Sequence, residues 1–264
     1  MQSLIHVKCS SQMTIKTTTN YYSHSTRQYA SIAVHCGNKY ARPKMNVSLL
    51  DDQELNTEST LAFRNLACSK GGRTLFQGVD CTVHSGKWLH IVGANGVGKT
   101  SLLRMLCGLA PVEAGEILWR GAPIGKIPEV FRRDLCYLGH LNALQESMTI
   151  QENLAFSCAL GGFMSEVAHV NELLHRFGVG GRGQQLVRHL SQGQKRRVAL
   201  SRLALSRAPL WVLDEPFVAM DHAGIHLLAD LIAQHLSTGG IAVLTSHQDV
   251  DIGSVPAQIL ELMA

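Results

Sequence analysis

One short glycine-rich segment carries the clearest chemical signal in this 264-residue chain. It reads Gly-Ala-Asn-Gly-Val-Gly-Lys-Thr, follows the apolar run Trp88–Val92 and precedes a helical pattern over Ser101–Cys107. Glycines let the backbone curl so that successive N–H groups point at phosphate oxygens, and the positive end of the next helix adds to that cradle. Lys99 can reach the outer phosphates, and Thr100 can place its hydroxyl on Mg²⁺. The expected triphosphate-binding residues are Gly93, Ala94, Asn95, Gly96, Val97, Gly98, Lys99, Thr100 and Ser101.

Two adjacent carboxylates follow a second apolar run. Leu210–Leu213 delivers Asp214 and Glu215 at its C-terminal end, and ligands of open α/β sheets bind at that edge. Asp214 is suited to hold Mg²⁺, which prefers oxygen ligands and keeps part of its water shell. Glu215 is placed to orient and polarise an attacking water, the role of a general base. The pair predicts hydrolysis of the bound triphosphate.

The segment Leu-Ser-Gln-Gly-Gln, residues 190–194, predicts a second anion site at the start of another helix. Ser191 can cap this helix, and together with Gly193 it offers a hydroxyl, a closely approachable backbone and the helix dipole. A chain with one phosphate-binding loop rarely needs a second phosphate site on the same face. The economical interpretation is that this site serves a nucleotide bound to another subunit.

The elements that must position these residues begin near Leu61. Strands are expected over residues 61–67, 79–83, 88–92, 116–120, 210–213 and 241–244. Helices are expected over residues 101–107, 149–160 with a capping box, 167–177, 191–208 and 222–236. This alternation predicts an α/β domain whose parallel sheet is covered on both faces.

Composition excludes several classes of protein. An apolar fraction of 45% suits a globular core, and no apolar stretch approaches the roughly 18 residues that cross a bilayer. The seven cysteines form no Cys-x-x-Cys pair, which favours reduced thiols over a disulfide or zinc framework. Six basic residues and no acid lie in residues 1–50, so the net charge of +4 leaves −2 for the remainder. This mildly acidic body argues against nucleic acid as a partner.

Residues 1–58 differ from the rest of the chain. They are rich in Ser, Thr, Asn, Tyr and His, show no helical or strand periodicity, and are expected to be poorly ordered. Three interpretations stay open: Met13 or Met45 is the true start, the segment is a basic organelle-targeting leader, or it is a functional tail. The domain is expected to span residues 59–264.

The ordered set of motifs resembles the ATP-binding cassette (ABC) ATPases. The glycine-rich P-loop, the signature at residues 190–194, the carboxylate strand, a loop ending at Asp221, and His247 after Leu-Thr-Ser follow in that family's order and spacing. The resemblance implies a P-loop fold with a mostly parallel sheet, an antiparallel flank and an inserted helical subdomain at about residues 126–208. It covers residues 61 to about 250.

The same resemblance implies roles for individual residues. Two copies would sandwich two ATP molecules with Mg²⁺, each between the P-loop of one copy and the signature of the other. Ser191, Gly193 and Gln194 would then act in trans. Asp221 would couple the two sites, and His247 would join Glu215 in catalysis by sensing the γ-phosphate.

Three positions depart from the family pattern. His140 stands where a glutamine usually touches Mg²⁺ and the membrane partner, and imidazole is a poor ligand for that ion. We therefore expect His140 to act in coupling through water or partner contact. Lys70 stands where an aromatic ring normally stacks on adenine, which predicts weak base stacking. Gln192 replaces a glycine of the signature, a milder change.

Longer stretches are similar to ATP-binding subunits of cytochrome c maturation (haem exporter) transporters. They comprise Gly-His at position 140 and residues 114–121, 196–203, 207–211 and 239–248. The resemblance implies a translocase ATPase that works with an integral membrane subunit in c-type cytochrome biogenesis, by haem transport or by release of a haem-loaded chaperone. It implies peripheral attachment at the cytoplasmic face of a bacterial inner membrane, or less favourably the mitochondrial matrix side.

Two other functions stay open at this point. One is the ATPase subunit of another exporter, such as a lipid or peptide exporter. The other is a soluble scaffold ATPase of the iron–sulfur assembly type, whose ATP cycle reshapes a protein complex without transport. Co-purification with membrane or with soluble partners would separate the two.

Overall fold

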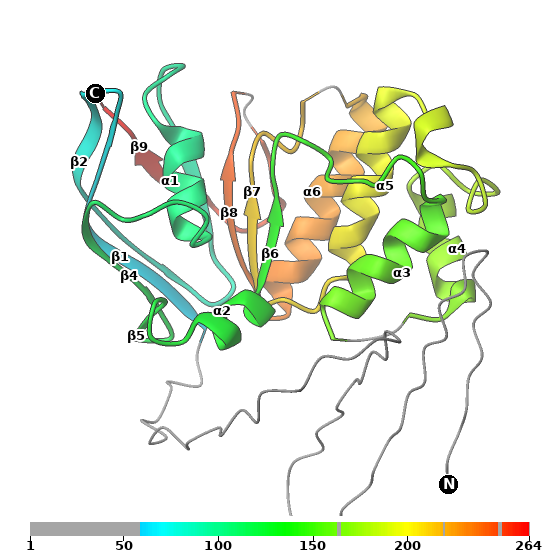
Figure 1. Cartoon of the computed structure of the whole chain (residues 1–264), viewed down its shortest axis with the longest axis horizontal. Helices are drawn as coiled ribbons and strands as arrows, with labels where there is room; N and C mark the ends of the chain where they lie inside the picture. Colours follow the sequence, from blue (N-terminus) through cyan, green and yellow to red (C-terminus); the bar gives the residue numbers. More distant parts are fainter. Residues whose placement is uncertain (1–58, 163–164, 219, 248–249, 264) are drawn as a thin grey trace, which may run out of the picture. The chain divides into compact units, whose positions relative to one another are not determined.

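A computed structural model describes residues 59–162, 165–218, 220–247 and 250–263 of the chain (Figure 1). The segment 1–58, for which a leader is one interpretation, lies outside the described residues. The described part contains one parallel and one antiparallel sheet with helices around them, which confirms the predicted α/β class. Within it, no helix combines the length and the apolar character that crossing a membrane requires.

The parallel sheet has five strands in the order β6-β7-β8-β3-β9. Its strands are β6 (Leu135–Leu138), β7 (Leu210–Leu213), β8 (Ile241–Thr245), β3 (Trp88–Val92) and β9 (Gln258–Glu261). Every residue of β7 and β8 is buried, as expected for strands covered on both faces. Successive side chains alternate between two hydrophobic cores: Trp211 and Leu213 face one, and Leu210 and Val212 face the other.

The first core lies against four helices on one side of this sheet (Figure 1). The helices are α3 (Ile150–Leu160), α4 (Val167–Arg176), α5 (Gln192–Leu205) and α6 (His222–Ser237). The predicted capping box is confirmed, because Thr149 accepts from the Glu152 N–H while the Glu152 carboxylate accepts from the Thr149 N–H. A short helix, α2 (Pro128–Asp134), precedes β6, and a 3₁₀ turn, η1 (Val187–His189), precedes α5.

The second core joins the other face of the parallel sheet to α1 (Lys99–Leu106) and to the antiparallel sheet. That sheet has the order β2-β1-β4-β5. Its strands are β1 (Thr60–Lys70), β2 (Arg73–His84), β4 (Ala114–Trp119) and β5 (Ala122–Pro123). This antiparallel sheet is the flank that the family resemblance implied, and Figure 1 shows it beside α1.

Some elements differ from the sequence-based expectations. Helix α5 ends at Leu205 rather than just before Pro209, because the Ser206 hydroxyl accepts from the Ala208 N–H in a turn that competes with the helix. Strand β9 was not expected, since most of its residues are exposed and it shows no clear alternation. The range 126–208, expected as helical, contains β6 as a strand of the central sheet.

His235 on α6 gives the fold a testable pH dependence. Its ring stacks on Trp211 at 3.9 Å between centroids, and its Nε2 lies 3.2 Å from the carbonyl oxygen of Ile241. Burial lowers the pKa of His235 from 6.5 to about 4. The unfolded chain therefore takes up this proton first as the pH falls, so the stability that the neutral ring contributes is complete above pH 6.5 and is lost toward pH 4.

We expect protonation of His235 in the unfolded chain to lower the free energy of unfolding by about 2 kcal/mol between pH 7 and pH 5. Urea unfolding of the wild type and of His235→Gln at both pH values measures it, because the variant lacks the titrating ring. The wild type should lose more stability than the variant by about that amount. Equal losses in the two proteins would contradict the assignment.

Candidate active site

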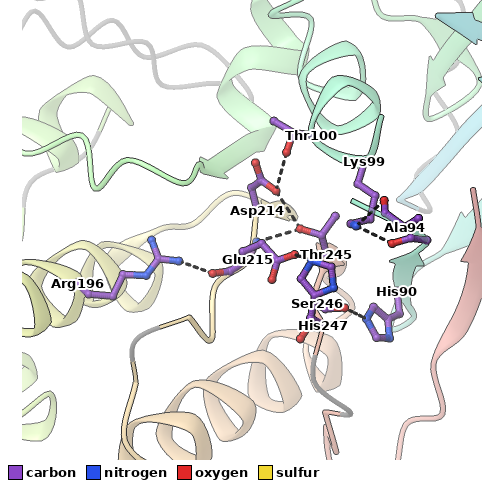
Figure 2. Close-up of polar contacts among 11 residues, drawn as sticks. His90, Ala94, Lys99, Thr100, Arg196, Asp214, Glu215, Thr245, Ser246 and His247 are labelled. Atoms are coloured by element: carbon purple, nitrogen blue, oxygen red, sulfur yellow. Dashed lines mark hydrogen bonds and ion pairs between the residues drawn. The ribbon is translucent and has the colours of Figure 1, made fainter. Parts of the chain in front are cut away.

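The predicted catalytic residues meet where three neighbouring strands of the parallel sheet end. The P-loop follows β3, Asp214 and Glu215 follow β7, and His247 lies two residues after β8. These three strands are adjacent in the sheet, in the order β7-β8-β3. Their carboxyl ends share one edge, which is where α/β sheets bind ligands. Figure 2 shows the side chains gathered there.

The P-loop has a backbone that only glycine adopts without strain at its key positions. Gly98, the N-cap of α1, has φ 113°, and a Cβ there would lie 3.0 Å from a ring carbon of Phe76. Gly93 has φ 143°, and a Cβ there would lie 2.7 Å from the carbonyl oxygen of Leu262. Larger residues would therefore displace β2 or the chain after β9. The glycines keep the loop at the N-terminus of α1, with Asn95 and Gly96 exposed.

Lys99 lies folded back against its own loop. Its side chain is buried, and its Nζ donates to the carbonyl oxygens of Gly93 at 2.7 Å and Ala94 at 3.3 Å (Figure 2). Both partners are neutral, so the ammonium gains attraction to an opposite charge when phosphate oxygens replace them. The lysine side chain therefore lies against the loop for which the sequence predicts phosphate binding.

Asp214 is a buried carboxylate bound by two hydroxyls. It is 2% exposed, and its Oδ1 accepts from Thr100 Oγ1 at 3.3 Å and from Thr245 Oγ1 at 2.9 Å. No lysine, arginine or histidine in the described ranges forms an ion pair with it. Thr100 and Asp214 thus present two hard oxygen donors side by side, which fits Mg²⁺, an ion that takes one or two protein oxygens and completes its shell with water and phosphate.

Glu215 and His247 are brought together from different strand ends. His247 Nε2 lies 3.3 Å from Glu215 Oε1, and the two side chains are 53% and 17% exposed (Figure 2). Glu215 has φ 49°, a left-handed conformation that is unusual for this residue type. Its N–H donates to Thr245 Oγ1 at 2.9 Å. The carboxylate therefore has a fixed backbone and remains within reach of water.

Thr245 was not singled out in the sequence, although it touches both carboxylate residues. It is fully buried at the end of β8, where its hydroxyl donates to Asp214 and accepts from the Glu215 N–H. The only available signal was a polar residue closing an apolar strand just before Ser246 and His247. Such a hydroxyl is common at strand ends, so the pattern alone could not assign it to the site.

A cleft of about 340 Å³ opens in front of the P-loop. It is lined by Lys70, Leu75, Asn95, Gly96, Gly98, Lys99, Thr100, Ser101, Glu215 and His247. No Phe, Tyr or Trp is among these described residues, and Lys70 lies where the resemblance led us to expect an aromatic ring. The cleft therefore offers charge and hydrogen bonds to a nucleotide, and its described lining contributes no Phe, Tyr or Trp ring on which adenine could stack.

Replacing Lys70 with Tyr is expected to tighten ATP binding by about 2- to 10-fold and to raise the preference for ATP over GTP. A stacked ring adds about 0.5–1.5 kcal/mol beyond its burial. Competition of each nucleotide against a fluorescent analogue measures both effects, with Lys70→Ala as the control that removes the ammonium without adding a ring. Unchanged selectivity in Lys70→Tyr would count against the stacking interpretation.

The signature residues do not line this cleft. Ser191 is the exposed N-cap of α5: its Oγ accepts from the Gln194 N–H at 3.2 Å, and its N–H donates to Gln194 Oε1 at 2.9 Å. Gly193 is also exposed, and a Cβ there would meet nothing within 4 Å. The structure therefore presents these groups at a helix start, with open space above the backbone.

The two residues predicted to act in coupling also lie outside the cleft. Asp221 caps α6, accepting from the Gly224 N–H at 3.0 Å, and forms an ion pair of 2.7 Å with Arg197 of α5. The Gly224 N–H and the Arg197 charge hold the pKa of Asp221 below its usual value. His140 is exposed in the loop after β6. The structure thus links Asp221 to the signature helix and leaves His140 facing solvent.

Comparison with known proteins places this geometry in a family. A family model described as ABC transporter matches residues 76–218. Among solved structures, the ATP-binding subunit of an ABC transporter superimposes with a TM-score of 0.65 at 26% identity, covering 71% of this chain and 79% of that one. An ABC transporter ATP-binding protein from Pyrococcus furiosus gives a TM-score of 0.67 at 25% identity, covering 77% and 98%.

Three relatives share the name cytochrome c biogenesis ATP-binding export protein CcmA. The protein from Albidiferax ferrireducens is 68% identical, covering 80% of this chain and 100% of its own length. Those from Dechloromonas aromatica and Escherichia coli K12 are 49% and 43% identical, covering 75% and 73% of this chain and 97% and 91% of theirs. The chain therefore belongs to the ABC transporter family and, within it, to the cytochrome c biogenesis ATP-binding export proteins.

Proposed function

We propose that this chain is the ATP-hydrolysing subunit of an ABC exporter that serves c-type cytochrome biogenesis. One observation carries the proposal: Lys99, Asp214, Glu215 and His247 converge at one sheet edge in a chain 68% identical to an export protein of that name. The names of these relatives favour this function over another exporter or an iron–sulfur scaffold. The reaction converts ATP and water into ADP and phosphate.

Catalysis in this proposal is mostly positioning and charge stabilisation. Backbone N–H groups of the P-loop and the Lys99 ammonium bind the β- and γ-phosphates, and the Glu215 carboxylate accepts a proton from the water that attacks the γ-phosphorus in line. His247, 3.3 Å from Glu215, would contact the γ-phosphate and orient that carboxylate. Thr100 and Asp214 would hold Mg²⁺, which neutralises phosphate charge when bound.

A second copy of the chain completes each site in this proposal. Ser191, Gly193 and Gln194 lie outside their own chain's cleft, and the first two are exposed, as residues that serve a neighbouring nucleotide must be. The helix dipole of α5 favours an anion at that point. Asp221, paired with Arg197 on the same helix, would report the state of one site to the other.

We further propose that residues 59–264 form one ATP-binding domain, with the helices between about 126 and 208 as the subdomain that carries the signature. An export system needs a membrane-embedded part, so an integral membrane subunit is the second partner. Exposed His140 and Leu141, the latter 82% exposed, suit contact with it. The chain would then work at the cytoplasmic face of a bacterial inner membrane.

Haem staining of c-type cytochromes tests this function in cells that lack the chain. Wild type should restore the stained cytochromes, whereas Glu215→Gln, expressed to the same level on an immunoblot, should not. Normal cytochromes in the absence of the chain would overturn the assigned pathway. Full rescue by Glu215→Gln would overturn the need for hydrolysis.

A further inference from the structure

A buried arginine joins two loops of the catalytic site. Arg196, in the second turn of α5, is 7% exposed. Its Nη2 donates to the carbonyl oxygen of Glu215 at 2.9 Å (Figure 2), and its Nη1 lies 3.4 Å from the carbonyl oxygen of Gly139 and 3.3 Å from Asn142 Oδ1. We infer that Arg196 is a positioning residue that holds Glu215 in its hydrolytic conformation. It also links Glu215 to the loop that follows β6 and contains His140 (the His140 loop).

The positive charge of Arg196 does not stabilise the fold through an ion pair. No carboxylate in the described part of the chain forms an ion pair with it, and the partners named above are neutral oxygens. Burial accordingly lowers the pKa of Arg196, which the nearby Asp214 charge only partly opposes. Desolvating a guanidinium without a paired charge is costly. A neutral side chain would avoid that cost. We therefore attribute the guanidinium to the several N–H groups with which it holds the two loops together.

The backbone conformation of Glu215 requires neighbouring groups to stabilise it. Its left-handed conformation, with φ 49°, costs roughly 1–2 kcal/mol and persists only where neighbours enforce it. Thr245 accepts from the N–H on one side of this residue, and Arg196 donates to the carbonyl on the other. Both peptide groups are thereby fixed, and the side chain between them points at His247.

Arg196 also connects the position of the Glu215 carboxylate to that of the signature residues. It lies on the helix that Ser191 caps, and Gly139 and Asn142 flank His140. A shift of α5 or of the His140 loop therefore moves the contact that fixes Glu215. This inference rests on the proposed role of Glu215 as the general base, and it adds how that base is held.

Steady-state ATP hydrolysis by the full-length Arg196→Gln variant tests it. We expect kcat to fall by about 10- to 100-fold, because a small misplacement of a catalytic group has effects of that size. KM and the ATP dissociation constant should stay within about twofold, since the P-loop keeps its contacts. Arg196→Lys should recover part of kcat, because an ammonium can still donate to the Glu215 carbonyl.

Arg202→Gln is the matched control. Arg202 lies on the same helix and donates to the carbonyl oxygens of Asn142 at 3.1 Å and Ala143 at 3.2 Å, but it has no contact with Glu215. This variant should keep kcat within about twofold of the wild type, because Arg196 still contacts Glu215 and holds the loop at Gly139 and Asn142. Thermal unfolding of all variants separates loss of fold from loss of turnover, and Arg196→Lys keeps the test available if Arg196→Gln does not fold.

Three outcomes would overturn the inference: wild-type kcat in Arg196→Gln, a loss of ATP affinity as large as the loss of kcat, or an equal loss of kcat in Arg202→Gln. Glu215→Gln measured in parallel distinguishes the two proposals. If that variant turns over normally, the role of Glu215 fails. If it is inactive while Arg196→Gln is unaffected, only the inference about Arg196 fails.

Discussion

Glu215→Gln is expected to bind ATP as the wild type does and to hydrolyse it about 10²- to 10⁴-fold more slowly. The amide keeps the size of the carboxylate but cannot accept the proton of the attacking water. The fixed backbone of residue 215 should leave Lys99 and the P-loop undisturbed. Because ATP persists, two copies should stay together around it.

Filter binding measures ATP affinity, phosphate release measures hydrolysis, and light scattering after gel filtration measures whether two copies associate. Glu172→Gln is the matched control, since it removes an exposed carboxylate on α4 and should behave like the wild type in all three assays. A Glu215→Gln protein that stays monomeric with ATP would refute the shared-site arrangement. Turnover at the wild-type rate would refute the role as general base.

Lys99→Ala is expected to weaken ATP binding by at least about 100-fold, which corresponds to roughly 3 kcal/mol. The change removes the buried ammonium that lies within the P-loop and leaves the phosphate charge without its main counter-ion. The glycine backbone remains, so the fold should persist. Equilibrium dialysis with labelled ATP measures the dissociation constant.

Lys87→Ala provides the control for this loss. Lys87 is exposed just before β3, at the end of the strand opposite the P-loop, so its removal changes the net charge equally without touching the cleft. Its affinity for ATP should match the wild type. Unchanged ATP affinity in Lys99→Ala would refute the phosphate-binding role of Lys99.

The parts of the site that could be predicted from the sequence are those set by short patterns. The P-loop and the strand that precedes Asp214 and Glu215 each combine an apolar run with polar residues at fixed spacing, and the structure places them at one sheet edge. The contacts of Thr245 and Arg196 could not be predicted. They depend on which strands become neighbours and on how closely α5 approaches the loop after β7, which no local pattern records.

The fold divides in the same way. Strands β7 and β8 were predictable because burial on both faces leaves continuous apolar runs. Strand β9 was not, because an exposed edge strand imposes no alternation on its residues. The end of α5 was set by a side-chain turn at Ser206 rather than by Pro209. Local hydrogen bonds of this kind compete with helix propensity and shift element ends.

Mixing two inactive variants tests most directly whether two copies of the chain build each hydrolytic site. Lys99→Ala lacks the phosphate cradle, and Ser191→Arg blocks the signature, so neither protein alone should release phosphate from ATP. A mixed dimer contains one site with an intact P-loop from one copy and an intact signature from the other. We predict that the mixture hydrolyses ATP. A mixture as inactive as its two components would contradict a site shared between copies.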